Sequence, residues 1–320
     1  MMMDKIYQLE ERELINIIHQ QLFSGNKDNI SRTKSYQNIY FLHPEIKWAF
    51  LAAMVSRNAG WNMCDLKGKL YPHILSPSMQ KDLFLTYERA NWLIFRDAYP
   101  QLLIYHYSTI VNRPLFHLLD HFSVSQFMKK EWLHFWNTRR KERLLKALII
   151  NEQHTIQKPV IKHPIYRKKV FHSSIFYLQE LFHFSCVIFP TLNGQLYGAS
   201  VVRFRKVSER VKLGIRLANI LFDPDLYFYF KQFAMKTEHT GSRFDYEKYL
   251  FPKKKRSTPM LRVVYPVIEH HVHQYEDWSL KQKPVFPSIR MKKPIHITDW
   301  FLKKQQQLEQ YVQFKLLFKK

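Results

Sequence analysis

Glycine and cysteine are both scarce in this chain. Only 7 of its 320 residues are Gly, far below the usual share of about 7%. Sheet-rich proteins use glycine at tight turns and bulges, so its scarcity argues against an all-β fold and favours helices. Cys64 and Cys186 are the only two cysteines. They are too few for a disulfide framework and suit a reducing compartment.

The sequence also lacks a long apolar run, and a membrane span needs about 18 such residues. The segment 174–189 comes closest, but Gln179, Glu180 and His183 interrupt it. The first 14 residues contain four carboxylates, whereas a signal peptide needs an apolar stretch there. We therefore expect a soluble, cytoplasmic protein without a transmembrane segment.

Motifs of the common nucleotide-using and nucleophilic enzymes are missing as well. The chain has no G-x-S-x-G, no G-x-x-x-x-G-K-[ST] and no G-x-G-x-x-G. His117 and His121 stand four residues apart, but no third ligand accompanies them at a spacing typical of zinc sites. We predict no metal ion and no cofactor, and the motifs leave open whether the protein is an enzyme.

Apolar residues recur at helical spacing along most of the chain, which predicts a mainly α fold with a multi-helix, bundle-like architecture. Asn193-Gly194, between β-branched and aromatic runs, predicts one small β-hairpin near 185–204. Helices are expected at 4–23, 45–59, 77–99, 125–150, 204–222 and 298–320.

Glycine and proline suggest where some of these helices begin and end. Gly60 is expected to end the helix at 45–59. Ser76 followed by Pro77 is typical of a helix start, and Pro100 is expected to interrupt or kink the helix that follows.

Positive charge is concentrated in the later part of the chain. Of the net charge of +24, residues 1–100 contribute little, with 12 Lys and Arg against 10 Asp and Glu. Residues 151–170 contain two prolines and have weak periodicity, which is typical of a linker. We predict a near-neutral to basic helical domain at 1–150 and a basic, mainly helical domain at 171–320 that is irregular over 251–297 before its terminal helix.

A polar cluster forms the first candidate site. The helix at 45–59 is apolar on every side until it ends in polar residues, so Arg57 should lie partly inside the protein. A buried carboxylate at Glu88 needs a cation, and Arg57 is a suitable partner. The cluster is either a structural ion pair or an anion site with a general acid or base. Its candidate ligand-binding residues are Arg32, Arg57, Asn58, Asn62 and Asn91, and its candidate catalytic residues are Glu88 and Asp97.

A basic stretch with interleaved aromatic rings forms the second candidate site. Lysine and arginine bind phosphates, and unpaired bases stack on rings such as Trp132, Phe135 and Trp136. A basic helix with aromatic anchors also fits an anionic membrane surface, and the stretch could instead combine a solvated face with core aromatics. The candidate nucleic-acid-binding residues are Lys129, Lys130, Arg139, Arg140, Lys141 and Arg143.

The chain resembles a known family in three stretches: "NISRT" (29–33), "HPEIKWAFLAAMVSRNAGWNMCDLKG" (43–68) and "WLIFRDAYPQLLIY" (92–105). These resemble the uncharacterised YppC-like proteins of Bacillus and relatives, a family of unknown function. The likeness continues in later segments as far as residue 247 and so covers most of the chain. The resemblance implies no activity.

Two functional hypotheses follow from these features. The leading one is a non-enzymatic protein whose basic helices bind a polyanion, with nucleic acid ahead of an anionic membrane. The alternative is an enzyme or a small-anion-binding protein that uses Arg32, Arg57, Glu88 and Asp97. The alternative requires Arg57, Glu88 and Asp97 to line one solvent-reachable pocket.

Overall fold

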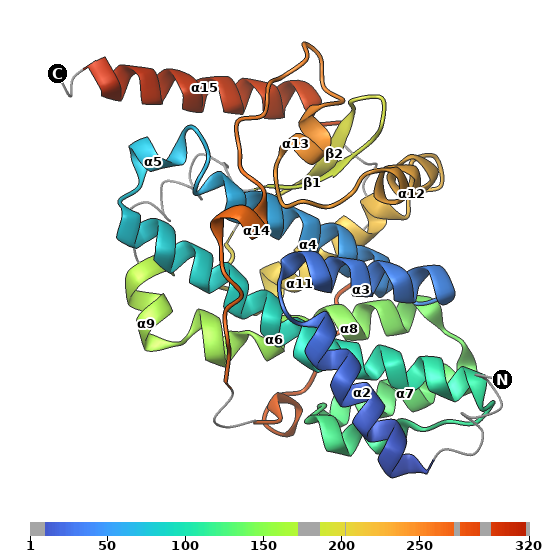
Figure 1. The fold of residues 1–320 in the computed structure, drawn as a ribbon. Helices are drawn as coiled ribbons and strands as arrows, with labels where there is room; N and C mark the ends of the chain where they lie inside the picture. The colour runs from blue at the N-terminus through green and yellow to red at the C-terminus, as the bar shows by residue number, and fades with distance from the viewer. Residues whose placement is uncertain (1–9, 172–185, 202, 272–275, 289–295, 318–320) are drawn as a thin grey trace.

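A computed structural model describes residues 10–171, 186–201, 203–271, 276–288 and 296–317. Helices dominate these residues and surround one two-stranded antiparallel sheet, so the prediction of a mainly α fold is confirmed (Figure 1). None of the described helices is both long enough and apolar enough to cross a membrane.

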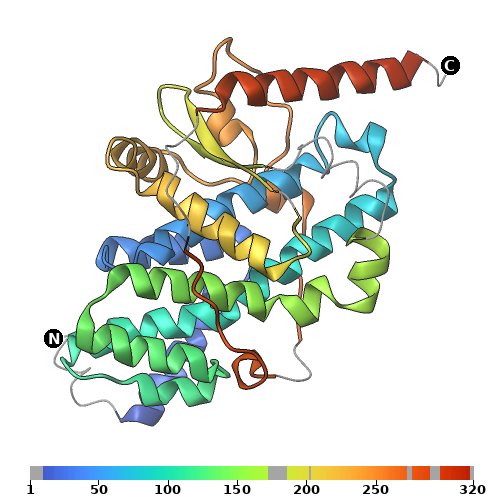
Figure 2. The same ribbon diagram turned by 180° about the vertical axis from the view of Figure 1, so that it is seen from behind.

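The helices differ widely in length, from 3 to 34 residues, and Figure 2 shows them from behind. In chain order, the earlier ones are α2 (Glu11–Gly25), α3 (Asn29–Leu42), α4 (Lys47–Asp65), α5 (Tyr71–Ile74), α6 (Pro77–Ile110), η1 (Phe116–Phe122), α7 (Gln126–Thr138) and α8 (Lys141–Thr155). The later ones are η2 (Gln157–Ile161), α9 (Pro164–Tyr166), η3 (Arg167–Phe171), α11 (Val207–Leu221), α12 (Tyr227–Lys236), α13 (Phe244–Glu247), α14 (Leu261–Val264), η4 (Trp278–Leu280) and α15 (Thr298–Leu317).

Helix α4 forms the centre of the hydrophobic core. It contacts α3, α6, α8, α11 and α14, which come from widely separated parts of the chain. Trp48, Phe50 and Met54 are at most 1% exposed. The prediction that this all-apolar segment is buried is therefore confirmed, because neighbours on every side remove its side chains from water.

Two predicted helix breakers lie inside helices instead. Helix α4 continues through Gly60 to Asp65. A Cβ atom added at Gly60 would lie 2.8 Å from the imidazole of His239, so the glycine allows that ring to pack closely against the helix. Pro100 lies within α6, which runs uninterrupted from Pro77 to Ile110. A proline inside a helix costs about 3 kcal/mol, and the buried neighbours of Pro100 show that packing offsets this cost.

The predicted β-hairpin is confirmed and is anchored to α4. Strand β1 (Cys186–Pro190) pairs antiparallel with β2 (Leu196–Ser200), and Gly194 adopts a positive φ of 80° in the turn. The Asn58 side chain donates from Nδ2 to the carbonyl of Ile188 and accepts from its N–H on Oδ1, both at 2.8 Å. Asn58 thereby satisfies two buried backbone groups of β1.

The segment predicted to be a linker, 151–170, is mostly helical in the structure. It contains the end of α8 followed by η2, α9 and part of η3, and its residues Val160, Ile161 and Val170 are at most 5% exposed. These three side chains belong to one hydrophobic cluster with Leu93 of α6. The segment therefore packs against the body of the protein, and the division of the chain into two domains stays a prediction.

Candidate functional site

Glu88 forms its buried ion pair with Arg32. The Nη2 atom of Arg32 donates to Oε2 of Glu88 at 2.5 Å, and both side chains are at most 5% exposed. Burial alone would raise the pKa of Glu88, but the charge of Arg32, its hydrogen bond and the nearby His270 lower the pKa below its ordinary value. The sequence correctly indicated that Glu88 would need a cation, but the predicted partner, Arg57, is wrong.

Arg57 instead binds the carboxyl-terminal end of α12. Its Nη1 donates to the carbonyl of Thr237 at 3.0 Å, and its Nη2 donates to the carbonyl of Ala234 at 3.0 Å and to Oε1 of Gln37 at 3.1 Å. Carbonyl groups at a helix end have no partner within the helix and attract cations. Burial lowers the pKa of Arg57 to about 10. The side chain therefore joins α4 to α12.

Asp97 has a third, separate environment. Its Oδ2 accepts from Nε2 of Gln101 at 2.9 Å and from Nδ2 of Asn151 at 2.5 Å. Asp97 lines a large surface cleft, whereas Arg57 and Glu88 line neither this cleft nor the second cavity described below. The enzyme hypothesis required these three side chains to line one pocket, and that prediction is wrong.

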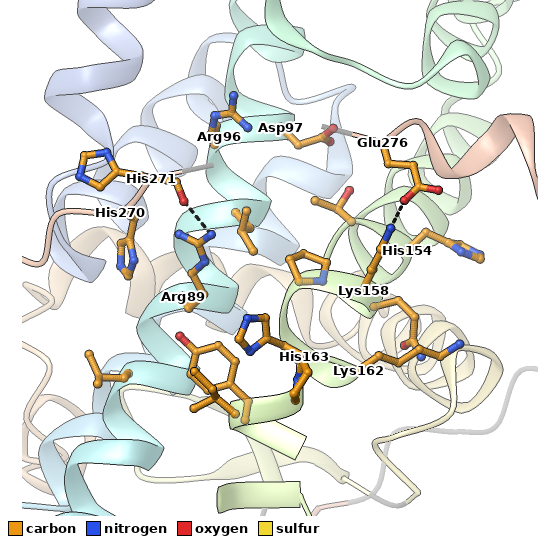
Figure 3. Close-up of a pocket in the computed structure, with 18 of the residues that line it drawn as sticks. Arg89, Arg96, Asp97, His154, Lys158, Lys162, His163, His270, His271 and Glu276 are labelled. Atoms are coloured by element: carbon orange, nitrogen blue, oxygen red, sulfur yellow. Dashed lines mark hydrogen bonds and ion pairs between the residues drawn. The ribbon is translucent and has the colours of Figure 1, made fainter. Parts of the chain in front are cut away.

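The large surface cleft has a volume of about 1880 Å³ and lies between α6, the segment 154–169 and the segments 269–271 and 276–282 (Figure 3). We call it the basic cleft, because seven Lys and Arg residues line it against four Asp and Glu residues. The cations are Lys81, Arg89, Arg96, Lys158, Lys162, Lys169 and Lys281, and the carboxylates are Asp82, Asp97, Glu269 and Glu276. Four histidines add further nitrogen atoms, His154, His163, His270 and His271.

Helix α6 positions two guanidinium groups along one wall of the basic cleft. Arg89, Trp92 and Arg96 are spaced by three and four residues, so they share one face of the helix. The two guanidinium carbons lie 5.2 Å and 5.8 Å from the centre of the Trp92 ring, within the range of cation–π attraction. Arg89 also donates to the carbonyl of His271 at 2.9 Å, which ties the later segment to α6 (Figure 3).

Some of the cleft's lysines are neutralised and others are not. Glu276 pairs with both Lys158 and Lys281, and Lys169 lies 3.4 Å from Asp82. Lys81 and Lys162 are exposed and have no carboxylate partner within the part of the chain that the structure describes. These two lysines leave the cleft with positive charge that a ligand could neutralise.

Aromatic rings also line the basic cleft. The His154 ring stacks on Trp278 with centroids 4.0 Å apart and planes 9° apart. Burial, with a smaller contribution from the charge of Arg210, lowers the pKa of His154 to about 4, so this ring is neutral at pH 7. Tyr166 lies beside His163, with a centroid separation of 5.3 Å. The cleft therefore combines cations with flat apolar faces.

The predicted nucleic-acid-binding stretch on α7 and α8 has a different structure. Trp132 and Phe135 are at most 1% exposed and pack in the core, so the expectation that these rings stack on bases is wrong. Arg143 forms two hydrogen bonds of 2.7 Å with Glu131. Lys129 pairs with Asp120, and Arg139 lies 4.6 Å from the Trp136 ring centre. The exposed residues Lys130, Arg140 and Lys141 remain candidates for a phosphate surface.

A second cavity, partly open to solvent, lies between α3, α4, α6, α8 and α11, and we call it the internal pocket. Its volume is about 240 Å³. Of the five predicted ligand-binding residues, Arg57 is outside it and four line it: Arg32, Asn58, Asn62 and Asn91. Tyr36, Glu152 and Arg210 also line the internal pocket, and the sequence patterns did not indicate them. Tyr36 stands four residues after Arg32, a spacing that could have indicated a shared helix face.

Comparison with known proteins shows which family the chain belongs to. The sequence model described as "Protein of unknown function (DUF2515)" matches residues 24–302. The chain belongs to this family. It is 52% identical over 300 residues to "Uncharacterized protein YppC" of Bacillus subtilis (strain 168), and the alignment covers 93% of each chain. No solved structure matches the chain. The predicted family resemblance is confirmed, and the family brings no activity with it.

The environment of Asp97 leads to a prediction about pH. Burial raises the pKa of Asp97 to about 7. This effect outweighs the hydrogen bonds and the charge of Arg96, which lower the pKa. Below about pH 4 the carboxyl is protonated in both the folded and the unfolded chain. Between about pH 4 and 7 the unfolded chain ionises first, so the wild-type protein loses stability as pH rises. Asp97→Asn should remove this loss and be more stable at pH 8 by up to about 4 kcal/mol.

Urea unfolding at acidic and alkaline pH measures this difference. The exposed Asp225 provides a control, because Asp225→Asn removes a carboxylate outside the basic cleft and should leave the pH dependence unchanged. If Asp97→Asn and Asp225→Asn have the same pH dependence, Asp97 titrates like a solvated carboxyl and its assigned environment is wrong.

Proposed function

We propose that the protein is a non-enzymatic binding protein that holds a single-stranded nucleic acid in the basic cleft. The charge of the cleft supports this most directly, with seven Lys and Arg against four Asp and Glu around a space of about 1880 Å³. Phosphate groups bind such cations and release condensed counterions, which is the main source of affinity for nucleic acids. The proposal keeps the polyanion hypothesis and moves its site from α7 and α8 to the cleft.

The aromatic rings favour an unpaired strand. Bases stack on aromatic faces regardless of sequence, and a duplex has no free base faces to offer along its length. The His154–Trp278 stack and Tyr166 provide such faces among the cations of the cleft.

The concave shape favours nucleic acid over an anionic membrane. A bilayer presents a surface that is nearly flat on the scale of one protein, so its headgroups contact protruding groups more easily than groups inside a cleft. A flexible strand can enter the cleft and follow its wall. The proposal places the protein in the cytoplasm, where such strands occur.

Fluorescence anisotropy of a labelled oligodeoxythymidine of about 20 nucleotides tests the proposal. We expect tight binding at low salt and a logarithmic affinity that falls linearly with the logarithm of salt concentration, by about 0.7 for each phosphate contacted. A duplex of the same length should bind more weakly because its bases are stacked. Binding that is undetectable, or that does not change with salt, would contradict the proposal.

A further inference from the structure

The internal pocket has walls suited to an apolar molecule. Apolar side chains from α4, α6 and α11 supply much of the lining, including Leu51, Ala52, Val55, Ile94, Leu213 and Leu217. Its volume of about 240 Å³ exceeds the roughly 150 Å³ of an apolar cavity that holds one benzene molecule. Scaled from the six carbon atoms of benzene, the internal pocket has room for about ten non-hydrogen atoms.

Two buried polar atoms of α3, on residues that line the internal pocket, have no hydrogen-bond partner among the residues that the structure describes. Arg32 is 1% exposed; its Nη atoms bind Asn26 and Glu88, but its Nε has no acceptor. Tyr36 is 3% exposed, and its hydroxyl has no partner either. Leaving such an atom unpaired costs about 1–3 kcal/mol, and proteins pair the great majority of them.

The positions of Arg32 and Tyr36 make a shared ligand geometrically reasonable. The two residues are four apart on α3, so their side chains leave the same face of the helix, and both line the internal pocket. One oxygen atom has two lone pairs and can accept from two donors at once. An oxygen near this face could therefore satisfy the Arg32 Nε and the Tyr36 hydroxyl together.

The cations around the internal pocket already have partners. Arg32 is paired with Glu88, and the guanidinium of Arg210 donates to Gln153, Gln157 and the carbonyl of Phe204. A charged ligand would lose its hydration without gaining an unneutralised partner, which is costly in a buried site. A neutral oxygen has a far smaller cost, so the pocket favours a neutral molecule over an anion.

We propose that the internal pocket binds a small, neutral, mainly apolar molecule whose carbonyl or hydroxyl oxygen accepts hydrogen bonds from Arg32 and Tyr36. This site is separate from the basic cleft and does not depend on nucleic-acid binding. Apolar walls with a few convergent polar groups are typical of small-molecule sites in proteins.

A matched pair of probes tests the proposal on the full chain. 1-Indanone and indane share one bicyclic skeleton that fits the estimated size, and only 1-indanone has a carbonyl oxygen. Saturation-transfer NMR detects binding of each probe, and a titration gives the two dissociation constants. We expect 1-indanone to bind at least about fivefold more tightly than indane, because its oxygen pairs two otherwise unpaired donors.

Two substitutions of the same chemical type locate the binding. Tyr36→Phe removes only the unpaired hydroxyl and should reduce the preference for 1-indanone several-fold while leaving the protein folded. Tyr40→Phe is the matched control, because Tyr40 lies on the same helix but its hydroxyl pairs with that of Tyr227, outside the internal pocket. This control should keep the full preference.

A third variant tests the volume of the pocket. Ala52→Leu places three additional carbon atoms at the wall and should weaken binding of both probes together. The proposal is overturned if neither probe binds the wild-type protein up to its solubility limit. It is also overturned if the two probes bind equally well, or if Tyr36→Phe binds 1-indanone as the wild type does.

Discussion

The double variant Lys81→Glu/Lys162→Glu is expected to bind the labelled oligodeoxythymidine about a hundredfold more weakly than the wild type at low salt. Both lysines are exposed, line the basic cleft and have no carboxylate partner among the described residues. Each replacement removes a phosphate contact and adds a repelling carboxylate. The salt dependence should also become shallower, by about 1.4 in its logarithmic slope for two lost contacts.

Lys130→Glu/Lys141→Glu is the matched control for this experiment. It makes the same chemical change at two exposed lysines of α7 and α8, which lie outside the basic cleft. Both double variants therefore have the same net charge, and any difference in binding reflects position. We expect the control to bind nearly as the wild type does. The opposite result, a loss in the control and none in the cleft variant, would place the strand on α7 and α8.

The basic cleft illustrates what local sequence patterns miss. Its cations come from three segments, 81–96, 158–169 and residue 281, which meet only after the chain has folded. The stretch 129–143 was conspicuous because its charges and aromatic rings are contiguous in the sequence. Contiguity on a helix says little about function in this protein, since the rings that made the pattern, Trp132 and Phe135, face the core.

Elements governed by local interactions were predicted well. Ser76 caps α6 by accepting from the N–H of Met79, and Pro77 occupies the first turn, as the sequence indicated. The hairpin forms around Asn193-Gly194 because its turn requires a positive φ that glycine adopts easily. Gly60 was misjudged for the opposite reason, since the close packing of His239 against α4 outweighs a local preference to end the helix there. Pro100 does not interrupt α6, and the kink that the sequence also allowed stays a prediction.

The polar cluster shows the same division between local and distant information. Burial of Glu88 and Arg57 follows from the apolar character of their helices, and both are at most 4% exposed. The choice between Arg32 and Arg57 as the partner of Glu88 depends on how α3 and α12 pack against the core. No spacing within one helix contains that information, so the pairing emerged only in the folded protein.

The largest expected effect on stability comes from breaking the Arg32–Glu88 pair. Glu88→Leu should lower the free energy of unfolding by about 3–5 kcal/mol, because it leaves the Arg32 guanidinium buried without a counter-charge. For a chain of 320 residues this corresponds to a fall in Tm of about 5–8 °C. Urea and thermal unfolding measure the two quantities. Glu142→Ala, which breaks the exposed pair with Lys47, is the control and should cost at most about 1 kcal/mol.

The double variant Arg32→Met/Glu88→Leu separates the attraction between the two charges from the cost of burying them. If desolvation dominates, replacing both ions by apolar side chains should be much less harmful than replacing Glu88 alone, since no unpaired charge remains. His270 lies 3.8 Å from Glu88 and would lose that neighbour in both variants, so its contribution cancels in the comparison. A double variant as unstable as the sum of Glu88→Leu and the single variant Arg32→Met would mean that Arg32 and Glu88 act independently. In that case the hydrogen bonds from Arg32 to Asn26, and not the ion pair, would hold α3 in place.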